Sequence, residues 1–286
     1  MVDVLLFDLD GTLYDQSNGY EANIHNNIFE FMAQAKGGKF DAISTVEEAK
    51  SVWKPIFEKY NLTKRGLLGE GYEFDGVEYD KFVRRGASKF IQPDPELRKF
   101  MISFPPNKRK VIFTNAPEFS AHEILGLLGV ADLVDGVFGS EFLDNQVCKP
   151  ERAAFEKVLK HLNIPESQYN RICFFEDSFK NLVAGKELGF QTVFVSSSTM
   201  LDEGRSNDET AIFDAVVHGK VGMELRTMMP HLWNEWQVIS VVLLRIMSQE
   251  LLNLWIQKHA GQVEFRSLLL ATKPNLRGHD WLKSCF

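Results

Sequence analysis

The stretch VDVLLFDLDGT, residues 2–12, decides the fold of this 286-residue chain. It begins with a short, mostly apolar run that ends at Asp8, which predicts a buried strand with polar side chains at its carboxyl end. The same pattern returns in three later runs, at 110–115 (KVIFTN), 171–175 (RICFF) and 191–195 (QTVFV). Weaker candidate strands lie at 136–139 and 215–217. Buried strands are therefore spread widely along the chain.

Helical patterns separate these strands, at 117–128, 150–162 and 178–188. Strands that alternate with helices predict an α/β fold, with a parallel sheet covered on both faces. Residues 16–93 differ, because they are rich in helix formers and aromatic residues and contain no clear buried strand. We therefore expect four regions. These are the first strand and its loop at 1–15, an inserted helical cap at 16–93, the remainder of the core at 94–225, and a helical C-terminal extension at 226–286.

The composition is typical of a soluble globular protein, with 44% apolar and 25% charged residues. The net charge of −7 argues against a nucleic acid polymer as the partner, because such binders carry a basic face. The three cysteines form no CxxC pair, which argues against a disulfide framework or a zinc site. No signal peptide or membrane span is evident, so we expect a cytoplasmic protein that does not bind membranes.

The C-terminal extension has a character of its own. Residues 226–286 hold seven Lys and Arg against four Asp and Glu, and four of the chain's five tryptophans. The apolar stretch 238–247 contains Arg245, which favours an amphipathic helix over a membrane-spanning one. Such a helix would dock on the core or contact another protein, and the sequence leaves its role open.

The first strand is followed by Asp8-Leu9-Asp10-Gly11-Thr12, which is the strongest chemical signal in the chain. Residues two apart on extended backbone project to the same side, so both carboxylates can reach one phosphate. Asp8 can attack phosphorus as a nucleophile, and Asp10 can protonate the leaving oxygen and then activate water. Gly11 lets the backbone come close to the phosphoryl oxygens. The competing interpretation is a solvated acidic turn.

Further polar groups follow the other strands. Thr114 and Asn115 can donate hydrogen bonds to phosphoryl oxygens, and Lys149 can neutralise charge on the transferring group. Magnesium prefers hard oxygen ligands, which Asp8, the backbone carbonyl of Asp10, and Asp177 could supply. Each signal has an ordinary structural alternative, namely a loop turn, a surface lysine, or a helix N-cap. Their common position at strand ends and helix starts of one sheet favours the catalytic interpretation.

Together these segments resemble the haloacid dehalogenase superfamily, whose four motifs are matched by FDLDGT at 7–12, FTN at 113–115, CKP at 148–150 and FEDS at 175–178. The resemblance implies a Rossmann-like core, an inserted helical cap and Mg²⁺. It also implies specific roles, namely a nucleophile at Asp8, an acid/base at Asp10, phosphate contacts at Thr114 and Lys149, and a metal ligand at Asp177. The dehalogenases of the superfamily lack the second aspartate, so Asp10 points to phosphate chemistry.

Within the superfamily, the chain is most similar to the pyrimidine 5′-nucleotidases of yeast and plants. The similarity rests on GYEFD at 71–75, KVIFTNA at 110–116, VCKPERAAFEKVLK at 147–160 and FFEDSFKNLVAGKELGF at 174–190. It implies a pyrimidine nucleoside monophosphate such as UMP or CMP as substrate, with Tyr72 as a candidate to line the base or ribose site. One departure is Glu176 before Asp177, where this subfamily more often has two aspartates, and whether Glu176 binds the metal directly is open.

Two alternatives accompany this prediction. The same core supports a sugar-phosphate or phosphoglycolate phosphatase, or a phosphosugar mutase. A fold by itself does not specify activity, so a non-catalytic interaction protein that retains the fold is the alternative from another class. The intact pair of Asp8 and Asp10, together with Lys149 and Asp177, argues for an enzyme acting on a small phosphorylated metabolite.

Overall fold

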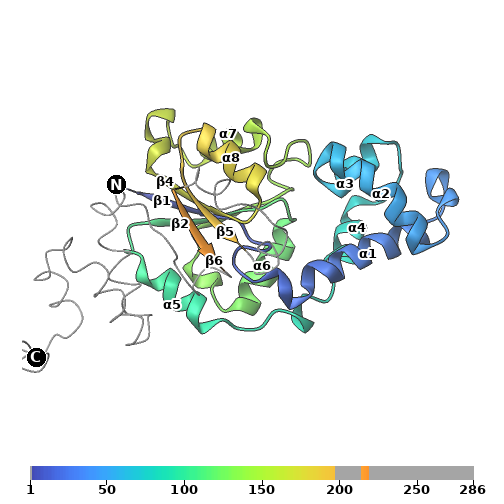
Figure 1. Cartoon of the computed structure of the whole chain (residues 1–286), viewed down its shortest axis with the longest axis horizontal. Coiled ribbons are helices and arrows are strands. Elements are labelled where there is room, and N and C mark those ends of the chain that lie inside the picture. The colour runs from blue at the N-terminus through green and yellow to red at the C-terminus, as the bar shows by residue number, and fades with distance from the viewer. Residues whose placement is uncertain (1, 197–213, 219–286) are drawn as a thin grey trace, which may run out of the picture. The chain divides into compact units, whose positions relative to one another are not determined.

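The computed structural model describes residues 2–196 and 214–218. Its centre is a parallel sheet, in which these residues contribute strands in the order β3-β2-β1-β4-β5-β6 (Figure 1). The strands span Val4–Phe7 (β1), Arg109–Phe113 (β2), Gly136–Phe138 (β3), Ile172–Glu176 (β4), Gln191–Ser196 (β5) and Ala215–His218 (β6). The predicted α/β fold with a parallel sheet is therefore confirmed, and all six predicted strands are present.

Strand β1 lies between β2 and β4, and its register brings the strand ends level. Phe7 is aligned with Ile112 of β2 on one side and with Phe175 of β4 on the other. All four residues of β1 are buried, which explains why its sequence is continuously apolar rather than alternating. From β1 the chain continues to β2 and β3 on one side of the sheet, and from β4 it continues to β5 and β6 on the other side. In such sheets, ligands bind beyond the carboxyl ends of the two central strands, where the strand order reverses.

Helices cover both faces of the sheet, with α7 and α8 on one side and α5 and α6 on the other (Figure 1). They span Pro95–Ser103 (α5), Glu118–Leu128 (α6), Arg152–His161 (α7) and Phe179–Glu187 (α8). On the first face, Phe155 of α7 and Leu182 of α8 pack with Leu6 in one buried cluster. On the second face, the rings of Phe7 and Phe175 stack at 4.6 Å. Successive residues of β1 therefore face opposite helical layers.

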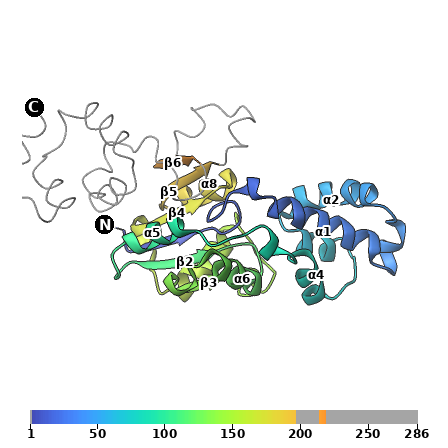
Figure 2. The same ribbon diagram turned by 90° about the horizontal axis from the view of Figure 1, so that it is seen from below.

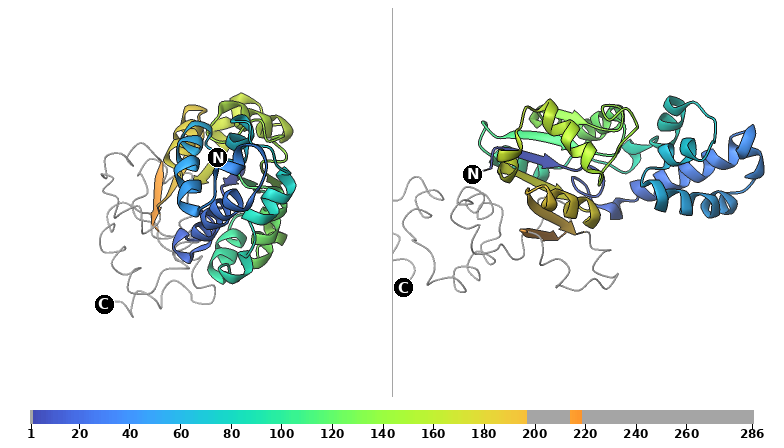
Figure 3. Two further views of the ribbon diagram at one scale, coloured as in Figure 1. Left: turned by 90° about the vertical axis from the view of Figure 1, so that its right-hand side faces the viewer. Right: turned by 90° about the horizontal axis from the view of Figure 1, so that it is seen from above.

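Between β1 and α5 the chain forms the cap helices, which we define as α1 (Tyr20–Gln34), α2 (Val46–Tyr60), α3 (Thr63–Gly69) and α4 (Gly76–Val83). Figures 2 and 3 show these helices grouped together. They enclose an apolar cluster of their own, which includes Met32, Phe40 and Leu67. The group therefore has its own hydrophobic core, as expected for an inserted helical segment.

Short 3₁₀ helices connect the main elements, at Gln16–Asn18, Gly38–Ala42, Ala87–Lys89, Ala131–Leu133 and Glu166–Arg171. None of the helices within residues 2–196 and 214–218 is long and apolar enough to cross a membrane. The predicted C-terminal extension at 226–286 lies outside the described residues, so the expected amphipathic helix and protein contact stay predictions. The predicted domain boundaries and the cytoplasmic location also stay predictions.

Candidate active site

The parallel sheet gathers polar residues from several strands at one edge. Asp8 follows β1, Thr114 follows β2, and Glu176 ends β4. Lys149 comes from the loop that precedes α7 and joins them there. The backbone N–H of Asp8 donates to the carbonyl oxygen of Phe175 at 2.9 Å, so the β1–β4 ladder extends to the first polar residue. The positions of these side chains therefore follow from strand register.

Lys149 is the centre of the site. Its Nζ lies 2.7 Å from Asp8 Oδ1 and 2.6 Å from Glu176 Oε2, and its side chain is 1% exposed. Burial alone would lower the pKa of Lys149, but the charges of Asp8 and Glu176 raise it above its usual value. The ammonium group is therefore held in its charged form. For Asp8, burial and the charge of Glu176 outweigh Lys149 and raise its pKa to about 7.

Glu176 accepts hydrogen bonds from three protein donors. Its Oε2 accepts from Lys149 Nζ and from Asn181 Nδ2 at 3.1 Å, and its Oε1 accepts from the backbone N–H of Ser178 at 3.1 Å. These bonds fix the carboxylate at the start of α8. Glu176 is thereby suited to orient Lys149, while its oxygens remain close to those of Asp8 and Asp177.

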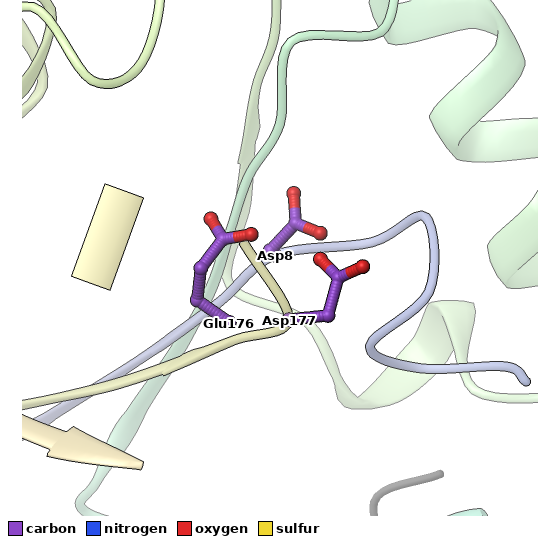
Figure 4. Close-up of side chains that lie close together, drawn as sticks. All are labelled: Asp8, Glu176 and Asp177. Atoms are coloured by element: carbon purple, nitrogen blue, oxygen red, sulfur yellow. The ribbon is translucent and has the colours of Figure 1, made fainter. Parts of the chain in front are cut away.

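Three carboxylates are arranged so that they could hold a metal ion. One oxygen each of Asp8, Glu176 and Asp177 lies within 4.8 Å of the others, and all three residues are buried (Figure 4). Burial and the charges of Glu176 and Asp8 raise the pKa of Asp177 well above its usual value. When all three carboxylates are ionised, their charge exceeds that of the one ammonium group, and a divalent cation would balance the excess. The all-oxygen donor set fits Mg²⁺.

Gly11 shows how closely the loop after β1 approaches this cluster. Its φ of +80° lies in the left-handed region, and a Cβ atom there would lie 2.4 Å from Asp177 Oδ2. The side chain of Gln16 donates to the same oxygen at 2.7 Å. The loop therefore requires glycine for its conformation and for the space taken by Asp177.

Asp10 does not join the carboxylate cluster. Its Oδ2 and Oδ1 accept from Arg84 Nη1 at 2.7 Å and Nη2 at 2.8 Å, and Oδ1 also accepts from the Tyr14 hydroxyl at 2.5 Å. Burial would raise the pKa of Asp10, but Arg84 lowers it below its usual value. The carboxylate is therefore held as an anion by a residue that follows the last cap helix.

Thr114 and Asn115 occupy different positions at the end of β2. Thr114 is 1% exposed, and its Oγ1 accepts from the backbone N–H of Ala116 at 3.1 Å. The amide of Asn115 pairs with the backbone of Lys149, accepting from its N–H at 2.9 Å and donating to its carbonyl at 3.1 Å. Asn115 therefore aligns the Lys149 loop. The predicted contacts of Thr114 and Asn115 with phosphate stay predictions.

Tyr72 lies in the cap core. It is 8% exposed, its ring centroid is 4.8 Å from that of Phe40, and Lys39 Nζ lies 5.7 Å from its ring. The structure brings Asp8, Lys149 and Asp177 together but places Tyr72 among residues of the cap cluster. Packing alone accounts for the position of Tyr72, and its predicted contact with a base or ribose stays a prediction.

Sequence reasoning did not single out several of the residues described above. Arg84 and Asn181 were not predicted, nor was Asn61, whose Nδ2 donates to the carbonyl oxygen of Lys149 at 2.7 Å. Asn181 lies one helical turn after the motif FEDS, so its position was a usable signal. Arg84 and Asn61 reach residues 74 and 88 positions away, and no local spacing reveals such contacts.

Comparisons with known proteins bear on this site. A family model described as haloacid dehalogenase-like hydrolase matches residues 2–189. Phosphate metabolism protein 8 of Saccharomyces cerevisiae is 25% identical over 199 residues, which are 65% of this chain and 59% of that protein. The chain thus spans about three fifths of the length of this curated relative.

Solved structures show the same fold. A phosphatase from Thermococcus onnurineus matches with a TM-score of 0.52 and 16% identity, over 76% of this chain and 93% of that one. β-Phosphoglucomutase from Clostridium difficile matches with a TM-score of 0.52 and 16% identity, over 84% of this chain and 100% of that one. At this identity the likeness concerns the fold.

We expect Gly11→Ala to weaken Mg²⁺ binding, because the added methyl group would displace Asp177. Gly129→Ala is the matched control, since Gly129 also has a positive φ, +74°, but its Cβ would meet nothing within 4 Å. Both variants should lose about 1–2 kcal/mol of unfolding free energy from left-handed backbone strain. Calorimetric titration with Mg²⁺ should show weaker binding for Gly11→Ala only, and equal affinities would contradict this assignment.

We also expect the stabilisation by Mg²⁺ to grow as the pH rises through about 7. A pKa of Asp8 raised to about 7 means that the metal-free folded protein holds a proton there more tightly than the unfolded chain does. The metal-free protein therefore loses stability as the pH rises from about 4 to 7, and metal binding must displace that proton. Each proton that the metal displaces, from Asp8 or from Asp177, should add about a tenfold rise in affinity per pH unit below the pKa of that group. Thermal melts with and without Mg²⁺ at about pH 5.5 and 8 would measure this, and a pH-independent Tm shift would contradict it.

Proposed function

Because the chain belongs to the haloacid dehalogenase-like hydrolase family, we propose that it is a magnesium-dependent phosphatase that uses Asp8 as its nucleophile. The observation that carries this proposal is the position of Asp8 at the end of β1. Its carboxylate contacts the buried ammonium group of Lys149 and lies beside Asp177 and Glu176. Asp8 is thus suited to attack phosphorus, because the ammonium group of Lys149 and a metal ion held by the carboxylates would neutralise the phosphoryl oxygens beside it.

The proposed reaction has two steps. In the first, an oxygen of Asp8 forms a bond to phosphorus while the ester P–O bond breaks. Asp10, which Arg84 holds as an anion in the free protein, must take up a proton from solvent on substrate binding and then gives it to the departing oxygen. In the second, Asp10 takes a proton from water, which attacks phosphorus, releases inorganic phosphate and restores the carboxylate of Asp8. Bound Mg²⁺, held by Asp8, Asp177 and the backbone carbonyl of Asp10, would neutralise charge on the phosphoryl oxygens.

Other residues hold the reacting groups in place in this proposal. Lys149 and Thr114 contact the phosphoryl oxygens, and Asn115 keeps the backbone of Lys149 aligned. Glu176 restrains Lys149 through a second contact with the same ammonium group. Because these charged groups are already oriented, they need not reorganise while the phosphoryl group is transferred, and this raises the rate of the reaction.

For the substrate, we propose a small phosphomonoester, most specifically a pyrimidine nucleoside 5′-monophosphate. The similarity to pyrimidine 5′-nucleotidases in the four segments quoted above supports this choice. The yeast relative is named for phosphate metabolism, which agrees with a phosphate-releasing role. We further propose that the enzyme works in the cytoplasm, where its buried thiols Cys148 and Cys173 stay reduced.

We expect Asp8→Asn to abolish hydrolysis of p-nitrophenyl phosphate, by at least about 10³-fold in kcat, because an amide does not attack phosphorus. Chelation by EDTA should also abolish turnover, and added Mg²⁺ should restore it. Asp132→Asn is the matched control, because Asp132 is 61% exposed and pairs with Arg98 on the surface. Turnover that survives either the Asp8 substitution or chelation would contradict the mechanism.

A phosphate-release screen tests the substrate. We expect UMP and CMP to give higher kcat/KM values than ribose 5-phosphate, glucose 6-phosphate or phosphoglycolate, because the base adds binding energy remote from phosphorus. The same protein sample with Asp8→Asn provides the blank. A preference for phosphosugars or phosphoglycolate would replace the nucleotide assignment and leave the phosphatase proposal standing. Absence of turnover on every phosphate ester would contradict both.

A further inference from the structure

Arg84 is a buried cation at the end of α4, and its guanidinium group has a defined set of partners. The side chain is 8% exposed. Nη1 and Nη2 each donate to Asp10, and Nε donates to the hydroxyl of Ser120 at 2.8 Å. These bonds use three of the five N–H groups of an arginine. Among residues 2–196 and 214–218, one N–H on Nη1 and one on Nη2 have no partner and remain for an oxygen of another molecule.

The surrounding residues fix the orientation of Arg84. The Tyr20 hydroxyl donates to the backbone carbonyl of Arg84 at 2.6 Å, and the guanidinium carbon lies 5.4 Å from the centre of the Tyr20 ring. Ser120 is fully buried near the start of α6. Contacts from α1 and α6 therefore hold both ends of Arg84, and its two remaining N–H groups are fixed in direction.

A second buried ion pair lies in the cap near Arg84. Lys64 and Asp80 form a salt bridge, and their side chains are 8% and 9% exposed. Burial raises the pKa of Asp80, while the charges of Lys64 and Arg84 act in the opposite direction. The two pairs are therefore close enough to interact. This part of the cap is rich in hydrogen-bonding groups that are already withdrawn from water.

We propose that Arg84 recognises the leaving group, and that the leaving group is a polyhydroxylated alcohol such as ribose or another sugar. The proposal rests on the proposed function, in which Asp10 contacts the ester oxygen. Two hydrogen bonds in series place the guanidinium nitrogens about 5 Å from that oxygen. Oxygen atoms of the leaving group that lie a few bonds beyond the ester oxygen could therefore come within hydrogen-bonding distance of the two remaining N–H groups.

The chemistry of a buried guanidinium selects an oxygen-rich leaving group. An apolar alcohol beside Arg84 would leave its N–H groups without acceptors, and buried unsatisfied donors are costly. A site built to donate to a substrate oxygen rejects the analogue that lacks it, by up to about 10⁴–10⁵-fold. Sugar hydroxyls and ring oxygens offer such acceptors next to the ester. The alternative role of Arg84 is structural, in which its ion pair with Asp10 only joins the cap to the core.

The test compares UMP with n-pentyl phosphate, because both are esters of primary alcohols and need the same proton from Asp10. We would measure kcat/KM for both substrates with the wild type, Arg84→Gln, Arg84→Lys and Arg85→Gln. Arg85→Gln is the matched control, because Arg85 is the next residue, is 46% exposed and pairs with Glu30. Loss of one charged hydrogen bond in Arg84→Gln should lower the ratio of kcat/KM for UMP to kcat/KM for n-pentyl phosphate by about 10–100-fold. Arg84→Lys should show a smaller fall, and Arg85→Gln none.

The outcomes separate the two roles of Arg84. An equal loss on both substrates, with a lower Tm, would show an ion pair that only positions Asp10 or joins the cap, and would overturn the proposal. If Arg84→Gln does not fold, the ratio in Arg84→Lys decides in the same way. A wild type that hydrolyses neither substrate nor p-nitrophenyl phosphate would overturn the proposed function and this inference with it. A wild type that is active, with a ratio unchanged in both Arg84 variants, would overturn the inference alone.

Discussion

The rest of the site depends on the buried ammonium group of Lys149, which lies between Asp8 and Glu176. Three fully or nearly fully buried charges would each be costly without the others, because transfer of an isolated ion from water requires many kcal/mol. Removal of one partner would leave the remaining charges uncompensated. The loop that carries Lys149, the end of β1 and the end of β4 are therefore constrained together, and Asn115 and Asn181 serve this constraint by fixing the groups around it.

The same constraint explains why β1 and β4 must be neighbours. Their register aligns Phe7 with Phe175, so the next residues, Asp8 and Glu176, emerge at the same level. A shift of the register by one residue would turn one of these carboxylates to the opposite face of the sheet. The apolar packing of the strands thus determines the geometry of the charged groups. Stability of the sheet and assembly of the site are two results of the same pairing.

Much of the fold could be predicted from the sequence because the signals are local. A buried parallel strand reads as an apolar run, and polar residues directly after it mark its carboxyl end, as at Asp8 and Asp177. The contacts of Arg84 with Asp10 and of Asn61 with Lys149 could not be predicted, because they join residues 74 and 88 positions apart in the sequence. Tyr72 illustrates a different limit. A run of aromatic residues gives no sign whether a ring will pack in a core, as this ring does on Phe40, or face a ligand.

The charged residues of the site form two sets, which come from different parts of the fold and have different roles in the proposed reaction. Asp8, Lys149 and Asp177 come from the sheet and its loops, and in the proposed reaction they would face the phosphoryl group that all phosphomonoesters share. The partner of Asp10 comes from the end of the cap, through Arg84. Asp10 thus belongs to the core by sequence and to the cap by its hydrogen bonds. If the protein is the phosphatase proposed above, the chemistry common to all its substrates is fixed by the sheet. In the same proposal, the acid that serves the leaving group is held by Arg84, at the end of the last cap helix. Selectivity can then change through the cap without disturbance of the buried charges on which the core depends.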